Sequence, residues 1–377
     1  MPMSQAQSVT ATFNAPHVHQ LVYSSSQNQW FDQDLSASIG GPLAKLGTGV
    51  SAFPINGDQV IYYLADNQHV HRLAYSTSTN QWSDQDGTAL TGGPIAASRG
   101  GISGFAIGAE HEYYIAGDQH VHQLIYYPSV NQWFDQDLSA LTGGTLAALG
   151  SKVSAFPVNG DQNAYYLASD QHVHLLMYSA TSNQWSDQDA TAITGGPGAV
   201  SGGGISGFAI GSDHHIYYLG GDQHVHQLLY STSANQWFDQ DLTSMTSGPL
   251  GASGSGVSGF AIGNDQHVYY LATDQHMHQM VYSASANQWF DQDLTSMTSG
   301  SLGALGSGVS GFAISGDQHV YYLATDQHMH QMVYSASANQ WFDQDFTSTT
   351  SGPLGASGSG VSGFAIGNDQ HVYYLAP

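Results

Sequence analysis

The chain repeats one unit seven times within its 377 residues. A His-x-His motif, a Tyr-Tyr pair and a single tryptophan recur in every unit, and successive tryptophans are 52, 51, 52, 52, 52 and 52 residues apart. Such a sequence must place seven equivalent units in equivalent surroundings, which is typical of repeat architectures. The tryptophans are Trp30, Trp82, Trp133, Trp185, Trp237, Trp289 and Trp341.

Each unit contains four short segments rich in the aromatic and β-branched residues that favour strands. In the unit around Trp289 the strands are expected at 257–262, 267–272, 276–283 and 288–295. The connections between them have three or four residues and contain Gly, Asn, Asp or Ser, as hairpin turns do. A longer Gly/Ser/Pro-rich loop then leads to the next unit. The pattern predicts a four-stranded antiparallel meander for each unit.

Four-stranded units repeated at about 40–50 residues indicate a β-propeller. The expected fold is therefore all-β, with seven blades of four antiparallel strands. The chain begins with the third and fourth strand types and ends with the first and second, so residues 1–40 and 361–377 are expected to form one closing blade. An open solenoid would instead need atypical capping units. We predict a single domain over residues 1–377.

Composition excludes several functions. Four basic residues stand against 28 acidic ones, giving a formal net charge of −24, so the chain lacks the cations that bind nucleic acid or an anionic membrane surface. Cysteine is absent, and no apolar run is long enough to span a bilayer. Because the first residues lack the features of a classical signal peptide, we expect a cytoplasmic protein or one released by a non-classical route.

The His-x-His motif permits two hypotheses. His276 and His278 lie two residues apart in a predicted strand, so they project from one face and would bind zinc if a further ligand were close. The alternative is hydrogen bonding within and between blades, where buried polar groups need partners. If Tyr282 pairs with Trp289, His278 faces Asp293, but a one-residue shift removes this pairing. We prefer the hydrogen-bonding hypothesis and predict neither metal nor cofactor.

The repeated tryptophan points towards ligand binding. An indole on an outer strand can pack against the next blade or offer its face to a sugar, while nearby amides and imidazoles bind the hydroxyls. Seven equivalent sites suit multivalent binding, whereas a glycosidase needs two carboxylates in different environments. The two arginines cannot form the arginine cluster of sialidase-type propellers, and no GxSxG motif is present. We therefore expect no enzymatic activity.

The segment HVYYLATDQHMHQMVYSASANQWF resembles the repeat of fungal and bacterial fucose-binding β-propeller lectins. Those repeats carry an IRVYY strand, an I-x-E-x-C-Y/W strand and a GxGWY segment. The resemblance covers about two of the four strands in each unit. It implies a sugar site between blades that is formed by an arginine, a glutamate and tryptophans.

The resemblance assigns site residues unit by unit. All seven tryptophans match. The arginine position holds Val60 and Asn163 in two units and histidine in the others, namely His111, His215, His267, His319 and His371. The glutamate position holds Arg72 and Leu175 in the same two units and glutamine in the others, namely Gln20, Gln123, Gln227, Gln279 and Gln331. Neutral side chains thus replace charged ones, whose hydrogen bonds are stronger.

These observations predict a multivalent lectin for glycans or glycoconjugates, including fucose-like sugars, with non-catalytic sites between adjacent blades. Gln279, Trp289 and His267 are expected to form one wall of a site, and the neighbouring blade the other. The units with Val60 and Asn163 should bind poorly. A structural or protein-interaction scaffold and a metal-binding propeller remain as alternatives, and the sequence is compatible with an oligomer.

Overall fold

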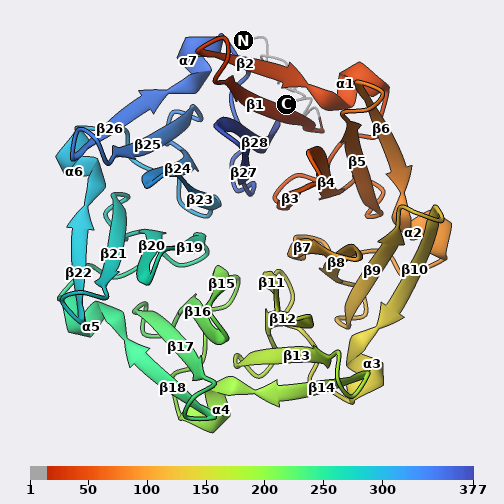
Figure 1. Cartoon of the computed structure of the whole chain (residues 1–377), viewed down its shortest axis with the longest axis horizontal. Coiled ribbons are helices and arrows are strands. Elements are labelled where there is room, and N and C mark those ends of the chain that lie inside the picture. Colours follow the sequence, from red (N-terminus) through yellow and green to blue (C-terminus); the bar gives the residue numbers. More distant parts are fainter. Residues whose placement is uncertain (1–14) are drawn as a thin grey trace, which may run out of the picture.

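The computed structural model describes residues 15–377 and shows seven four-stranded antiparallel sheets arranged as the blades of a ring (Figure 1). The prediction of a seven-bladed β-propeller is confirmed. We number the blades along the chain: blade 1 contains β3–β6, and blades 2 to 6 follow in groups of four up to β26. Blade 7 combines β27 and β28 with β1 and β2. Residues 1–14 lie outside the described residues. They are part of the predicted closing blade, and the expectation about a signal peptide also concerns them.

The strands of each blade run from the ring's centre to its rim. The innermost strands are β3 (Val50–Ile55), β7 (Ile102–Ile107), β11 (Val153–Val158), β15 (Ile205–Ile210), β19 (Val257–Ile262), β23 (Val309–Ile314) and β27 (Ser362–Ile366). The second strands are β4 (Asp58–Leu64), β8 (Ala109–Ile115), β12 (Asp161–Leu167), β16 (Asp213–Leu219), β20 (Asp265–Leu271), β24 (Asp317–Leu323) and β28 (Asp369–Ala376). The third strands are β1 (His17–Ser24), β5 (Val70–Ser76), β9 (Val121–Tyr127), β13 (Val173–Ser179), β17 (Val225–Ser231), β21 (Met277–Ser283) and β25 (Met329–Ser335). The rim strands are β2 (Gln29–Asp34), β6 (Gln81–Asp86), β10 (Gln132–Asp137), β14 (Gln184–Asp189), β18 (Gln236–Asp241), β22 (Gln288–Asp293) and β26 (Gln340–Asp345).

A five-residue helix follows each rim strand, where the sequence predicted strand and loop. In blade 5 the expected strand 288–295 ends at Asp293, whose side chain caps α6 by accepting a hydrogen bond from Ser296 N at 2.9 Å. Asp is a favoured N-cap residue because its carboxylate satisfies a free N–H of the first turn. The helices are α1 (Leu35–Ile39), α2 (Gly87–Thr91), α3 (Leu138–Thr142), α4 (Ala190–Thr194), α5 (Leu242–Thr246), α6 (Leu294–Thr298) and α7 (Phe346–Thr350).

The two ends of the chain close the ring. Strand β1 pairs antiparallel with β28, so that Val18 lies opposite Leu375 and Leu21 opposite Val372. The resulting sheet has the order β2-β1-β28-β27, as the strand types at the two termini predicted. Closure by this shared blade leaves no incomplete sheet among residues 15–377, and the ring therefore needs no capping unit.

The strand register follows the first of the two alternatives left open by the sequence. Tyr282 lies opposite Trp289, and His278 lies opposite Asp293. The β21–β22 turn contains Asn287 with φ 51°, and Tyr282 donates a hydrogen bond to its Oδ1 at 2.6 Å. Asn tolerates this left-handed conformation better than most residues, which makes it a suitable turn residue at this position.

Each Tyr-Tyr pair contributes to the core on both sides of its blade. Neighbouring residues of a strand face opposite sides of the sheet. Accordingly, Tyr269 packs towards blade 6, where it meets Trp341, and Tyr270 packs towards blade 4 in a cluster with Tyr217. Fully burying one aromatic side chain of this size stabilises the fold by about 1.5–3 kcal/mol. The core therefore consists of seven clusters between blades.

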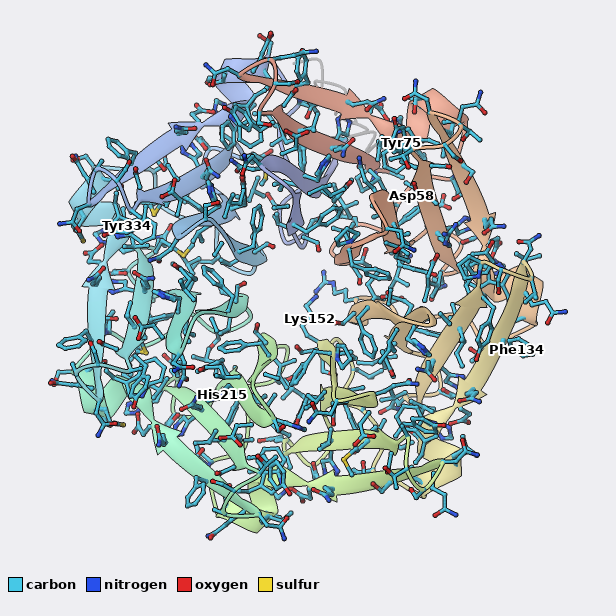
Figure 2. All side chains as sticks on the ribbon, viewed as in Figure 1. Asp58, Tyr75, Phe134, Lys152, His215 and Tyr334 are labelled. Atoms are coloured by element: carbon cyan, nitrogen blue, oxygen red, sulfur yellow. The ribbon has the colours of Figure 1, made fainter. Side chains whose placement is uncertain are left out.

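The inner strands approach closely at the ring's centre. A Cβ added at Gly256, before β19, would lie 2.8 Å from Val309 N and 3.1 Å from Gly308 Cα of the next blade. Glycine is therefore required there by contact with backbone. Figure 2 shows Lys152 pointing towards the axis of the ring. Over residues 15–377, no helix has the length and apolar character needed to cross a membrane.

Candidate functional site

A buried hydrogen-bond network links blade 5 to blade 6. The amide nitrogen of Gln279 lies 2.7 Å from Tyr269 Oη, 3.0 Å from His267 Nδ1 and 2.6 Å from Gln318 Oε1 of the next blade. The Tyr269 hydroxyl also donates to Gln318 Oε1, at 2.5 Å. Gln279 is 1% exposed, and its amide oxygen takes no part in this network. Two predicted site residues, Gln279 and His267, are thus brought together.

The same network recurs at four further junctions between blades. Each consists of a glutamine, a histidine and a tyrosine from one blade and a glutamine from the next. All five predicted glutamine–histidine pairs belong to it. The sets are Gln20, His371, Tyr373 and Gln59; Gln123, His111, Tyr113 and Gln162; Gln227, His215, Tyr217 and Gln266; and Gln331, His319, Tyr321 and Gln370.

The junction of blades 1 and 2 contains a buried ion pair instead. Arg72 donates to the two carboxylate oxygens of Glu110 at 2.5 and 2.6 Å, and Tyr62 donates to the same carboxylate at 2.7 Å. The Arg72 guanidinium also lies 4.6 Å from the centre of the Tyr126 ring. Both sides of this junction differ from the glutamine networks. Arg72 occupies the position of Gln279, and Glu110 occupies the position of Gln318.

The junction of blades 3 and 4 departs in another way. Leu175 replaces the glutamine, and Asn163 replaces the histidine. Tyr165 Oη lies 2.6 Å from His214 Nδ1 of the next blade. Asn163 is fully buried, and neither atom of its amide has a hydrogen-bond partner among the described residues. The two units that were predicted to bind poorly are therefore those without the glutamine network.

Cavities lie beside three of the glutamine networks. The cavity between blades 5 and 6 has a volume of about 360 Å³ and is lined by His267, Gln279, Met297, Tyr334 and Trp341. An equivalent cavity of about 380 Å³ lies between blades 4 and 5, and one of about 530 Å³ between blades 6 and 7. Polar and apolar side chains share the walls of these cavities, and the first also includes Gln292, Gln318, Asn339 and Gln340.

The tryptophan at each cavity belongs to the following blade. Trp341 lines the cavity of Gln279, whereas Trp289 lines the preceding cavity together with Gln227. The expected grouping of Gln279 with Trp289 is therefore wrong. The sequence places these residues in one unit, but they lie on opposite sides of the blade. Trp289 is 5% exposed and meets Tyr217 edge-on, with ring centres 6.3 Å apart, so it also packs the blades together.

The histidines of the glutamine networks carry no charge at neutral pH. Burial lowers the pKa of His267 to about 4, and the nearby Asp265 offsets only part of this effect. The pKa values of His215, His319 and His371 are lowered to about 4 for the same reason, and burial also lowers the pKa of His111. Each site therefore offers neutral imidazole and amide groups, not a cation.

The His-x-His motif faces the other side of each blade. His276 Nδ1 lies 2.8 Å from Asp293 Oδ2, and His278 Nδ1 lies 2.9 Å from Asp291 Oδ2. His278 thus contacts the carboxylate two residues before the one directly opposite it in the register. These cross-strand contacts agree with the hydrogen-bonding hypothesis, although they leave the Nε2 atom of His278 without a partner among residues 15–377.

Several cavity residues were missed by the sequence analysis. Gln318 is the equivalent of Gln266, which precedes the expected strand 267–272, but it is the second residue of β24 and contacts Gln279 of blade 5. Met297 lies on the unexpected helix α6, and Tyr334 is the equivalent of Tyr282, which was considered only for the strand register. The available signal for Gln318 was that Gln precedes the His of the second strand in three units, at Gln266, Gln318 and Gln370.

Fold and cavities together define a seven-bladed β-propeller with cavities of small-molecule size at three of its blade junctions. No protein-family model and no curated protein match the chain in sequence. Its fold is similar to that of several solved lectins. The BP39L lectin from Burkholderia pseudomallei has a TM-score of 0.63 and 13% identity, over 85% of this chain and 89% of the lectin.

Two fungal structures show the same likeness. The fucose-specific lectin from Aleuria aurantia, described as a six-bladed propeller, has a TM-score of 0.52 and 16% identity, over 80% of this chain and 95% of the lectin. AofleA from Arthrobotrys oligospora has a TM-score of 0.56 and 12% identity, over 89% and 91% of the two chains. At these identities the likeness concerns the fold.

Proposed function

We propose that the protein is a multivalent, non-catalytic lectin that binds neutral sugars in the cavities between its blades. The observation that carries this proposal is the composition of the cavity between blades 5 and 6. Trp341, Tyr334 and Met297 supply apolar surface, while Gln279, Gln318 and His267 supply uncharged hydrogen-bonding groups. A pyranose presents the same combination, since its C–H faces are apolar and its hydroxyls both donate and accept.

The buried network supports recognition of hydroxyl groups. It holds the Gln279 side chain in one orientation and leaves its amide oxygen available as an acceptor. A fixed polar group costs little conformational entropy on binding, which increases affinity. Repetition at several junctions would raise the apparent affinity for surfaces that display many copies of a glycan.

Fucose and related neutral sugars are the first ligands to test. The lectin from Aleuria aurantia with which the chain shares its fold is fucose-specific. The cavities of this chain have glutamine and neutral histidine where that family has glutamate and arginine. Hydrogen bonds between neutral groups are roughly half as strong as charge-assisted ones, so we expect weak individual sites and a strong dependence on multivalency.

A glycan array with matched variants tests the proposal. Met245→Lys with Met297→Lys places a charged side chain over two cavities without altering the buried network. The control, Leu90→Lys with Ile193→Lys, makes the same changes at the equivalent helix positions of the two junctions that lack the glutamine network. The four side chains are similarly exposed, at 57%, 58%, 59% and 57%.

We expect wild-type protein to bind a defined set of glycans, with binding at least tenfold weaker in the Met245/Met297 variant and unchanged in the control. Absence of binding across neutral and acidic glycans would overturn the lectin proposal. Equal losses in the two variants would show that added charge, not the cavities, determines binding.

A further inference from the structure

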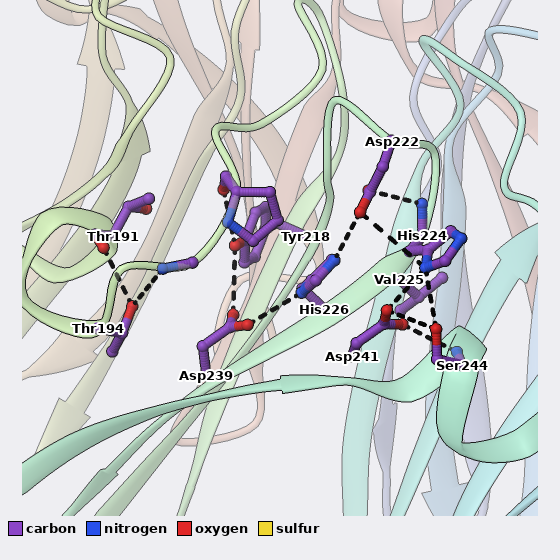
Figure 3. Close-up of polar contacts among 12 residues, drawn as sticks. Thr191, Thr194, Tyr218, Asp222, His224, Val225, His226, Asp239, Asp241 and Ser244 are labelled. Carbon is purple, nitrogen blue, oxygen red and sulfur yellow. Dashed lines mark hydrogen bonds and ion pairs between the residues drawn. The ribbon is translucent and has the colours of Figure 1, made fainter.

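Blades 3 and 4 each contain a cluster of two histidines and two aspartates that the lectin proposal does not use. In blade 4 the cluster consists of Asp222, His224, His226 and Asp241 (Figure 3). One nitrogen or oxygen atom from each of these side chains lies within 4.8 Å of the others. The equivalent cluster of blade 3 contains Asp170, His172, His174 and Asp189.

The local structure turns one donor atom of each side chain into the cluster. Asp222 Oδ1 accepts from His224 N at 3.0 Å, and Asp241 Oδ1 accepts from Ser244 N at 2.8 Å. The Oδ2 atoms of the two aspartates face the cluster, and Asp241 Oδ2 also accepts from Ser244 Oγ at 2.6 Å. Asp222 Oδ2 lies 3.3 Å from His226 Nε2 and 4.0 Å from His224 Nδ1, which is 2.8 Å from Asp241 Oδ2.

These separations suit a small divalent cation. Zinc binds imidazole nitrogen and carboxylate oxygen at about 2.0–2.2 Å, so tetrahedral ligand atoms stand about 3.3–3.6 Å apart. The observed separations of 3.3 and 4.0 Å bracket this range. The pair at 2.8 Å must open by about half an ångström to fit the ligand spacing of zinc.

The second histidine is oriented as a metal ligand. His226 Nδ1 lies 3.2 Å from Asp239 Oδ2, so this carboxylate would accept the Nδ1 proton while the Nε2 lone pair, which faces Asp222 Oδ2 at 3.3 Å, binds a cation. Carboxylate–histidine pairs commonly orient metal-ligating imidazoles in this way. The Asp239 carboxylate in turn accepts from Tyr218 Oη at 3.4 Å (Figure 3).

In four other blades the equivalent histidine nitrogen lacks a hydrogen-bond partner among the described residues. In blades 1, 2, 5 and 6 the equivalent Nε2 atom is buried and has no hydrogen-bond partner among residues 15–377. A buried polar atom without a partner costs about 1–3 kcal/mol, and a bound cation would remove this cost. The atoms belong to His71, His122, His278 and His330.

We propose that blades 3 and 4 each bind one divalent transition-metal ion, with Zn²⁺ as the reference ion, through the His₂Asp₂ clusters. His224 would bind through Nδ1 and His226 through Nε2, both as neutral imidazoles. The chain's formal net charge of −24 favours cation uptake. The cluster lies on the side of blade 4 opposite Gln227, so it is separate from the sugar cavity.

Zinc analysis of matched variants tests this proposal. Untagged full-length protein is stripped with a chelator, reloaded with Zn²⁺ and passed through metal-free buffer before elemental analysis. The test variant is Asp170→Asn with Asp222→Asn, which retains the backbone hydrogen bonds of the turn. The control is Asp161→Asn with Asp213→Asn, which makes the same charge change at the opposite ends of the same blades, where these residues accept from Ala180 N and Thr232 N.

We expect wild type and control to retain at least two zinc ions per chain, and the test variant to retain two fewer or to bind them at least tenfold more weakly. Asn67→Asp should strengthen zinc binding by blade 1, because Asn67 already forms the equivalent turn with His69 N at 2.9 Å. Loss of all zinc from wild type, or equal retention by the test variant, would overturn the proposal. Circular dichroism of the metal-free variants checks their folding.

Discussion

The side-chain amides of Gln279 and Gln318 meet across the junction of blades 5 and 6, with Gln279 Nε2 2.6 Å from Gln318 Oε1. Each candidate sugar site is therefore built by two consecutive blades. The tryptophan of a site comes from the blade that supplies the second glutamine. This arrangement determines which substitutions act on the same site.

Pairs of substitutions should distinguish shared from separate sites. Gln279→Ala with Trp341→Ala alters one cavity, whereas Gln279→Ala with Trp289→Ala alters two. For a sugar identified on the array, we expect the number of bound molecules per chain to fall by one in the first double variant and by two in the second. Native mass spectrometry measures this number directly.

The prediction for the first double variant would be contradicted if Gln279→Ala with Trp341→Ala lowered the number of bound sugars per chain by two. Truncating a buried tryptophan costs about 3–5 kcal/mol of stability, so each variant also needs a thermal unfolding curve. Trp341→Ala and Trp289→Ala serve as mutual controls, because both tryptophans are 5% exposed and occupy equivalent positions.

The ion pair of Arg72 and Glu110 should be strongly coupled. Glu110→Gln alone leaves the buried Arg72 cation without its partner, which we expect to destabilise the protein by about 3–5 kcal/mol. Arg72→Gln with Glu110→Gln recreates the pair found at Gln123 and Gln162, and most of this loss should be recovered. Denaturant unfolding of the wild type, both single variants and the double variant measures the coupling free energy. Additive losses would show that the two side chains act independently.

The repeat predicted the blades well because strand period, turn residues and tryptophan spacing are local properties. Tyr282 pairs with Trp289 in the structure, which is one of the two registers that the sequence left open. Helix α6 was missed because five residues rich in Ser and Thr carry almost no helical periodicity. Its sequence marker was Asp293, which was placed inside the expected strand 288–295 and which in fact caps the helix.

The candidate sites were predicted only in part because a site combines two units. His267 and Gln279 were placed correctly beside each other, since second and third strands pair within one blade. Trp289 pairs with Tyr282, three residues from Gln279, so strand alternation puts Trp289 and Gln279 on opposite faces of the blade. The sequence left this register open, and it did not show which neighbouring blade Gln279 faces. The two histidines of the motif were considered as zinc ligands, but we preferred hydrogen bonding and predicted no metal. The aspartates of the proposed cluster come from a turn and a helix cap.

The histidines of the glutamine networks should make the protein sensitive to acid. In the unfolded chain a histidine has a pKa of 6.5, whereas burial lowers the pKa of His215, His267 and His319 to about 4 in the folded protein. Between these values the unfolded state binds protons that the folded state does not, so stability falls as pH falls from 6.5 to 4. Each histidine contributes up to about 1.4 kcal/mol per pH unit within this window.

Urea unfolding between pH 7.5 and 4 measures this dependence. Replacing the three histidines by glutamine retains a hydrogen-bonding side chain but removes the titration, and the slope of stability against pH should become shallower below pH 6.5. The nearby Asp213, Asp265 and Asp317 remain in both proteins, so their contribution cancels in the comparison. Identical slopes for wild type and the triple variant would contradict the prediction.

Asn163 should be a site where an apolar residue stabilises the fold. Its amide is fully buried and has no hydrogen-bond partner among the described residues, and an unsatisfied buried polar group costs about 1–3 kcal/mol. Blade 1 has Val60 at the equivalent position, where it is 1% exposed. We therefore expect Asn163→Val to raise the free energy of unfolding by about 1–3 kcal/mol, measured by denaturant unfolding.

Val60→Asn provides the matched reverse substitution. It places an amide in an equivalent buried position beside the Arg72–Glu110 pair, and we expect it to lower stability. The two changes exchange the same side chains between equivalent positions. The difference in strand preference between Asn and Val therefore changes the free energy of unfolding by nearly equal amounts of opposite sign in the two variants. If Asn163→Val destabilised the protein, the amide would have to be satisfied by bound water, and its replacement would then lose real hydrogen bonds.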